Sequence, residues 1–292
     1  MSRYKNITEK EIGKILRDHK LYSETKNARK VKGKQANFSG YNLAKINFKG
    51  AELAGANFEG ANLVSANLEG ANCINTNFKR ANLEGANFKK ANLESANLQN
   101  TFVKFTDFEG ANCINVNLVD AMLDMPNLKG SIFKNANLKS ARCLGVDFVG
   151  ANFEGANLFS ADLSYDTDDD GGVIETRLAG ANFKNANFRN ADLRGVHFVD
   201  NPLAGLGHNM EAATIKKSVK GYVKREAANI EGANFEGANL EGAQLGENVV
   251  KTSTERNRHD EHDFTKIKDK PAQILAKSLM NFEAFSYSDE EE

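Results

Sequence analysis

The sequence lacks the features that direct a chain into a membrane or along a secretory route. No window reaches the roughly 18 apolar residues of a membrane-spanning helix. The first ten residues, MSRYKNITEK, contain no apolar run of signal-peptide length. The formal net charge of the 292 residues is only −1, which excludes a chain that is polyanionic or polycationic throughout. We therefore expect a cytoplasmic protein without a membrane span and without nucleic acid as its main partner, with export as an effector as the open alternative.

The sequence also lacks the motifs that many enzymes carry at their catalytic centres. It contains neither a glycine-rich phosphate-binding loop nor a nucleophile elbow. Metal-capable side chains gather at 259–263, but without the His-Glu-x-x-His spacing of a helical zinc site. Two further histidines, His197 and His208, are expected to lie in solvent. These observations predict a protein that is not an enzyme.

What the sequence does contain is a five-residue repeat. From Phe38 to Leu163 every fifth residue is Leu, Phe, Val or Cys, usually with Ala two positions earlier. Alternate side chains of an extended segment share a face, so the central residue and the Ala would point inward while the last two residues turn a corner. A fixed period of this kind predicts stacked coils. The expected core includes Phe38, Phe58, Phe78, Phe88, Phe108 and Phe148.

Units such as Ala36-Asn37-Phe38-Ser39-Gly40 resemble the pentapeptide-repeat family, whose consensus is Ala-(Asp/Asn)-Leu-x-x. The similarity extends over 36–203 and 228–245. It implies an all-β solenoid, namely a right-handed parallel β-helix of square cross-section with about four pentapeptides per coil. In such a stack Cys73 and Cys113 lie two coils apart and Cys143 lies on the opposite wall, too far for a disulfide. We interpret the three cysteines as small buried hydrophobes, which fits a reducing compartment.

The segments outside the repeats predict helical caps at both ends. Thr8 and Glu11 form a capping-box pattern before a helix expected over 9–22, followed by a basic linker over 26–34. The linker is either a solvated turn or a weak anion contact. A C-terminal tail over 247–292 contains a second expected helix at about 271–283. That helix could cap the stack, cover an apolar surface or pair two chains as a homodimer.

Residues twenty apart become neighbours on one wall if each coil takes four repeats. The sequence Lys49, Glu69, Lys89, Glu109, Lys129 then alternates in charge up one wall. The family includes proteins that resist quinolones and are thought to imitate DNA with an acidic face. An alternating wall does not favour that function, type II topoisomerase (DNA gyrase) binding and protection from inhibitors, which stays as an alternative.

A different wall brings apolar residues to positions that should face solvent. Phe102 would lie next to Met122, and Phe105 next to Met125, with Leu144 one coil further on. A contiguous apolar surface usually marks a contact of some kind. Either an external protein partner or the chain's own tail is expected to cover it.

The repeat is interrupted twice. The first interruption, a loop at 166–176, places Asp166, Asp168 and Asp170 like the first half of a calcium loop, but Glu175 stands two residues before the position of the bidentate ligand. Calcium and a plain solvated acidic loop remain the two interpretations. The second interruption, at 204–227, predicts a short basic helix before the last coil at 228–246. Its lysines are candidate contacts with a partner: Lys216, Lys217, Lys220 and Lys224.

The function that these patterns favour is a non-enzymatic interaction or scaffold protein, which presents β-helix walls and inserted loops to a protein partner. Topoisomerase protection is the first alternative, partly supported by the inserted loops because family members that protect gyrase contact it through such loops. A calcium-regulated binding module is the second.

Overall fold

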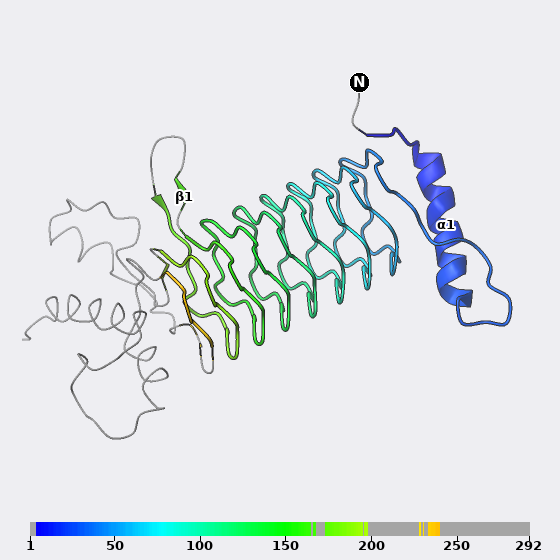
Figure 1. Ribbon diagram of the computed structural model, residues 1–292. Coiled ribbons are helices and arrows are strands. Elements are labelled where there is room, and N and C mark those ends of the chain that lie inside the picture. Colours follow the sequence, from blue (N-terminus) through cyan, green and yellow to red (C-terminus); the bar gives the residue numbers. More distant parts are fainter. Residues whose placement is uncertain are drawn as a thin grey trace, which may run out of the picture.

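The computed structural model of the protein describes residues 4–164, 166–167, 173–194, 196–197, 228, 230 and 233–239. Its main body is a stack of similar coils with a helix across one end (Figure 1). The inserted segment at 204–227, the expected helix at 271–283 and the metal-capable stretch at 259–263 lie outside the described residues.

The stack is a parallel β-helix with four five-residue units per coil. Parallel bridges join residues twenty apart, as in Asn37 with Asn57 and Asn42 with Asn62. The ladder bonds run in both directions between coils: the Phe38 N–H donates to the Asn57 carbonyl at 2.6 Å, and the Asn57 N–H donates to the Ala36 carbonyl at 2.9 Å. Four bridge positions per coil define four walls, which we number from the first residue of each: wall 1 from Asn37, wall 2 from Asn42, wall 3 from Asn47 and wall 4 from Glu52.

Most corners are tight turns closed by one backbone hydrogen bond. The Ala56 N–H, for example, donates to the Leu53 carbonyl at 2.8 Å. The residue two after each central apolar residue has a positive φ, for example 74° at Gly55 and 56° at Asn75. A single positive φ at the third turn position is the mark of a type II turn, which favours Gly and Asn. The repeat therefore carries Gly, Ser or Asn at this place for a conformational reason.

The core is a column of apolar side chains inside the coils. All six phenylalanines expected there are at most 1 % exposed. Neighbouring rings stack from coil to coil, with centroids 4.9 Å apart for Phe38 and Phe58 and 5.2 Å apart for Phe58 and Phe78. The three cysteines are buried and free, and burial raises the pKa of the Cys73 thiol.

Outside the core, the bridge residue before each central side chain is usually Asn, and at many of these positions its amide makes two bonds. The Asn77 Nδ2 donates to the Asn57 Oδ1 of the preceding coil at 3.1 Å, and the Asn77 Oδ1 accepts from the Lys79 N–H at 3.1 Å. Such side-chain to backbone bonds stabilise turns locally. These amide ladders run along the walls. An asparagine that makes such bonds is therefore the usual residue at a bridge position.

The first interruption is a protruding hairpin that keeps the five-residue phase. Strand β1 (Asp166–Thr167) pairs antiparallel with β2 (Val173–Ile174), and the hairpin leaves the side of the stack (Figure 1). Across it, bridges join residues thirty apart, as in Asn152 with Asn182. Ten residues are therefore looped out and the next coil resumes in register. After the second interruption, Asn187 bridges Asn234, so the chain re-enters wall 1.

Helix α1 (Glu9–Thr25) covers the first coil and extends three residues beyond the expected 9–22. Thr8 is its N-cap, and the Thr8 and Glu11 side chains form the capping box. Ile12 is buried against the core, and the His19 Nδ1 accepts a hydrogen bond from the Ala36 N–H at 3.1 Å. Within the described part of the chain, no helix combines the length and the apolar character needed to cross a membrane.

Candidate interaction surface

An apolar strip lies on wall 2 and its adjoining corner, formed by Phe102, Phe105, Met122 and Met125. Phe102 and Phe105 are 50 % and 52 % exposed, among the largest apolar exposures of the described residues. Phe102 bridges Met122 in the next coil, so the two side chains are neighbours on the wall. Both methionines are partly exposed. The strip therefore spans two consecutive coils and offers four large, adaptable side chains to solvent.

The strip interrupts an amide ladder. Below it, the Asn62 Nδ2 donates to the Asn42 Oδ1 at 2.8 Å, and the Asn82 Oδ1 accepts from the Glu84 N–H at 3.0 Å. Phe102 occupies the next bridge position of this wall, after Asn82, and has no polar side-chain atom to make either kind of bond. At this position the wall loses side-chain hydrogen bonds and exposes an aromatic ring to water. Neither change stabilises the free protein.

The corner beside Phe102 is also unusual, because bulky apolar residues occupy its left-handed turn position. Phe105 has φ of 54° and Met125 has φ of 49°, at the turn position where other coils carry small or polar residues. A bulky side chain in this left-handed region is strained. Pro126 follows Met125 and has no N–H to close the turn. The Lys104 ammonium lies 5.0 Å from the centre of the Phe105 ring, a cation–π distance.

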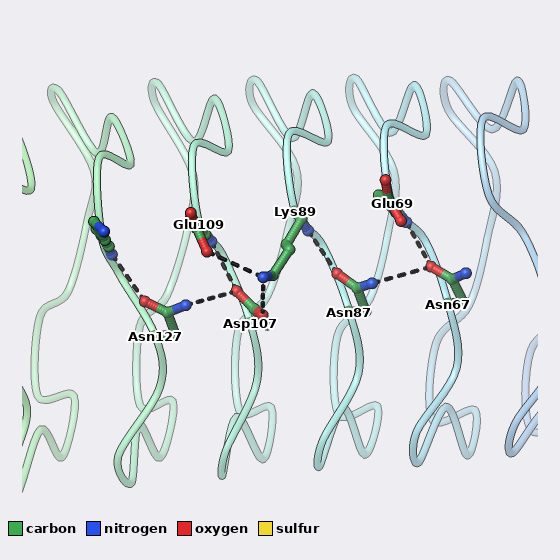
Figure 2. Close-up of polar contacts among 8 residues, drawn as sticks. Asn67, Glu69, Asn87, Lys89, Asp107, Glu109 and Asn127 are labelled. Carbon is green, nitrogen blue, oxygen red and sulfur yellow. Dashed lines mark hydrogen bonds and ion pairs between the residues drawn. The ribbon is translucent and has the colours of Figure 1, made fainter.

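Several charges on the walls form ion pairs between coils. On wall 3, Lys89 Nζ lies 3.0 Å from Glu109 and 3.3 Å from Asp107, as Figure 2 shows. The hydrogen bonds to Glu109 and then to Asp107 raise the pKa of Lys89, and the same contact lowers the pKa of Glu109. Lys49 pairs with Glu69 at 3.0 Å in the same way. The predicted alternation of charge is present here as ion pairs between coils.

The expectation that Leu144 extends the apolar strip into solvent is wrong. Leu144 is only 8 % exposed. The residue twenty positions later is Ser164, itself 7 % exposed, after which the chain departs for the β1–β2 hairpin. Leu144 thus lies next to the place where the chain leaves the regular stack for the insertion, directly after the last bridge of twenty-residue spacing on wall 2, Arg142 with Asp162.

The expectation that His197 lies in solvent is also wrong. It is 3 % exposed, and its Nε2 lies 3.3 Å from the Glu175 carboxylate. Burial lowers the pKa of His197, and the nearby Arg177 lowers it further, while Glu175 opposes both. Glu175 directly follows β2, so the end of the insertion brings this carboxylate to His197.

The calcium hypothesis stays a prediction. Of its four candidate ligands, only the Glu175 side chain is described, and it faces His197. Asp168 and Asp170 lie outside the described residues, and for Asp166 only the backbone in β1 is described. Among the residues that the structure describes, no group of three metal-capable side chains comes together. Lys216, Lys217, Lys220 and Lys224 also lie outside them.

Sequence inspection missed three exposed apolar side chains: Ile132 on wall 4, and Leu21 and Val31 near the first coil. Ile132 could have been found, because it bridges Asn112 and Asn152 and so occupies an amide position. Leu21 and Val31 belong to no repeat, and their exposure depends on how α1 lies on the stack.

A family model for pentapeptide repeats matches eight copies, over 34–70, 66–103, 104–139, 136–165, 174–200 and 226–247. No relative was found among curated proteins. Similar solved structures include HetL, a pentapeptide repeat protein involved in heterocyst differentiation regulation from the cyanobacterium Nostoc sp. strain PCC 7120. It is 18 % identical with a TM-score of 0.56, covering 82 % of this chain and 95 % of HetL.

A second similar structure is QnrB1, a plasmid-mediated fluoroquinolone resistance protein, at 18 % identity and a TM-score of 0.40 over 79 % of this chain and 95 % of QnrB1. The coil geometry and the family match together give the fold as a right-handed quadrilateral β-helix. The family model matches more than half of the chain, and the chain therefore belongs to the pentapeptide repeat family.

Proposed function

We propose that this chain is a non-enzymatic interaction protein that presents the apolar strip to a protein partner. The observation that carries the proposal is the exposure of Phe102 and Phe105, at 50 % and 52 %. Both stand where the repeat places polar or small residues. Aromatic and Met side chains are enriched in the buried centre of protein interfaces.

Both phenylalanines carry a local cost in the free coil. Phe102 lacks the two amide hydrogen bonds that Asn62 makes on the same wall, and Phe105 holds a left-handed conformation that Asn or Gly adopts more easily. Both residues destabilise the free coil, yet they lie together on one surface. Burial of that surface by a bound partner would account for their presence there. The interior of the described coils supports a role without catalysis, because phenylalanine and leucine side chains fill it.

The structure offers a matched control for this proposal. Ile132 is a 40 % exposed apolar residue that also interrupts an amide ladder, but on wall 4 rather than wall 2. Phe102→Asn with Phe105→Asn removes the strip, whereas Ile132→Asn removes an equally unusual residue elsewhere. Both sets restore the residue type that the repeat prefers.

The test is a comparative affinity capture from the native host with these variants. We expect partners captured by the wild type to be retained by Ile132→Asn and lost by the double variant of the strip. An identical set of captured proteins for all three forms would contradict the proposal. Association of the strip with the chain's own tail, residues 247–292, would appear instead as a gain of partners when that tail is deleted.

A further inference from the structure

A second surface lies at the opposite end of the described stack from the hairpin, and it is basic. Residues 4–34 contain ten Lys and Arg side chains and four carboxylates, a formal net charge of +6 in a chain whose total is −1. Within these residues the structure records one ion pair, Lys20 with Glu24 at 3.9 Å. Concentration of one sign of charge at one end of a molecule favours an anionic partner there.

Helix α1 orients this charge away from the stack. Lys10, Lys14, Arg17 and Leu21 recur at helical spacing and share one exposed face. The face that packs on the coils is opposite and contains Ile12, Ile15, Leu16 and His19. The basic stripe therefore points outward and ends at an apolar residue.

The linker after α1 adds to the same surface. Its backbone is fixed along the second half of the helix, because the Lys34 N–H donates to the Asp18 carbonyl at 3.2 Å and the Lys32 N–H donates to the Thr25 Oγ1 at 2.8 Å. A Cβ on Gly33 would lie 2.9 Å from the Leu21 Cβ, so the linker runs directly against Leu21. Val31, two residues earlier, is 48 % exposed and Leu21 is 44 % exposed.

We infer that this N-terminal basic face, formed by the outward stripe of α1 and the linker 29–34, docks on an anionic lipid surface. Cations around a pair of exposed aliphatic side chains match the two layers of a membrane interface, with phosphate and carboxylate headgroups outside and acyl chains beneath. Nucleic acid would take up the cations but offers no apolar layer to Leu21 and Val31. The lipid surface therefore accounts for both observations together.

The absence of tryptophan makes a direct test available. Leu21→Trp places a single fluorophore in the proposed contact, and Phe102→Trp places one in the strip as a control. Full-length protein is mixed with neutral phosphatidylcholine vesicles, or with vesicles containing about 30 % phosphatidylserine. We expect co-sedimentation with the anionic vesicles only, and a blue shift of emission for Leu21→Trp but not for Phe102→Trp.

The cations are tested by charge reversal at two places. Lys30→Glu with Lys32→Glu should weaken binding to the anionic vesicles by about tenfold or more, since each cation near such a surface contributes a substantial share of the attraction. Lys79→Glu with Lys129→Glu reverses the same number of charges on the walls. That control should change the affinity by less than about twofold, because those positions lie two and four coils away from the first coil, and solvent ions screen charges at such separations.

Three results would overturn the inference. The first is no co-sedimentation of the wild type with anionic vesicles. The second is co-sedimentation without a blue shift for Leu21→Trp, which would show that lipid acyl chains are not contacted. The third is tighter binding of a duplex DNA of about 20 base pairs than of the vesicles at equal salt, which would assign the basic face to nucleic acid.

Discussion

Phe102 bridges Met122 on wall 2, one coil after Asn82, the last bridge asparagine before the apolar strip. One coil thus changes a wall from an array of amides into an apolar surface, without altering the backbone register. The repeat preserves the backbone of the β-helix, while the side chains at the bridge positions distinguish the surface of this chain.

Phe105→Asn should stabilise the protein. Phe105 has a φ of 54°, which Asn tolerates better than an aromatic residue, and the Phe side chain is half exposed. We expect the free energy of unfolding to rise by about 0.5–1 kcal/mol. Chemical denaturation measures it, and a fall of similar size would show that the ring contributes to folding through contacts with the coil.

Phe78→Ala should be far more damaging than any change to the strip. Phe78 is fully buried, with its ring 5.2 Å from that of Phe58. Removing it opens a cavity in the core, and we expect a loss of about 3–5 kcal/mol. Phe102→Asn is the control, since lost packing and regained amide bonds roughly offset one another. Its free energy of unfolding should stay within about 1 kcal/mol of the wild type. Equal losses would contradict the assignment of core and surface.

The anchoring of α1 should weaken in acid. Burial lowers the pKa of His19 below its ordinary value of 6.5, and Lys26 lowers it further while Glu52 opposes both. The Nδ1 that accepts from the Ala36 N–H must be unprotonated. The unfolded chain therefore binds more protons at low pH, so stability is fully present above about pH 6.5 and falls as the pH drops toward the lowered value.

His19→Asn isolates this effect, because an amide oxygen can replace Nδ1 as the acceptor without titrating. His197 contributes in the same direction, since burial also lowers its pKa. Thermal melts between about pH 5 and 8 should show a smaller pH dependence for His19→Asn than for the wild type. Parallel curves for the two proteins would show that His19 does not titrate on unfolding.

The ion pairs between coils should contribute little and only at low salt. Lys89, Glu109 and Asp107 form a contact that is open to solvent. Lys89→Gln should therefore lower the melting temperature slightly in dilute buffer and leave it unchanged at high ionic strength. A large fall in melting temperature that does not depend on salt would show that these ion pairs contribute substantially to the stability of the coils.

The sequence was sufficient for the parts of the molecule that the repeat controls. The twenty-residue spacing, the buried phenylalanines and the preserved phase across the first insertion all follow from the period of five. It failed at Leu144 and His197, because both lie where an insertion changes what covers a wall position. Ile132 stands where the other residues of its ladder are mostly asparagine, and this difference can be seen in the sequence. Comparing each bridge residue with the others on its own wall therefore reveals unusual surface residues that the five-residue period alone does not.

The most direct test of the central claim is photo-crosslinking from the strip itself. A photoreactive phenylalanine analogue replaces Phe105 in the full chain within the native host, and Ile132 in a matched control. We predict crosslinks to another protein from position 105 and none to that protein from position 132. Crosslinks from position 105 that reach only this chain's own tail, residues 247–292, or no crosslinks from it, would contradict a surface built for a partner.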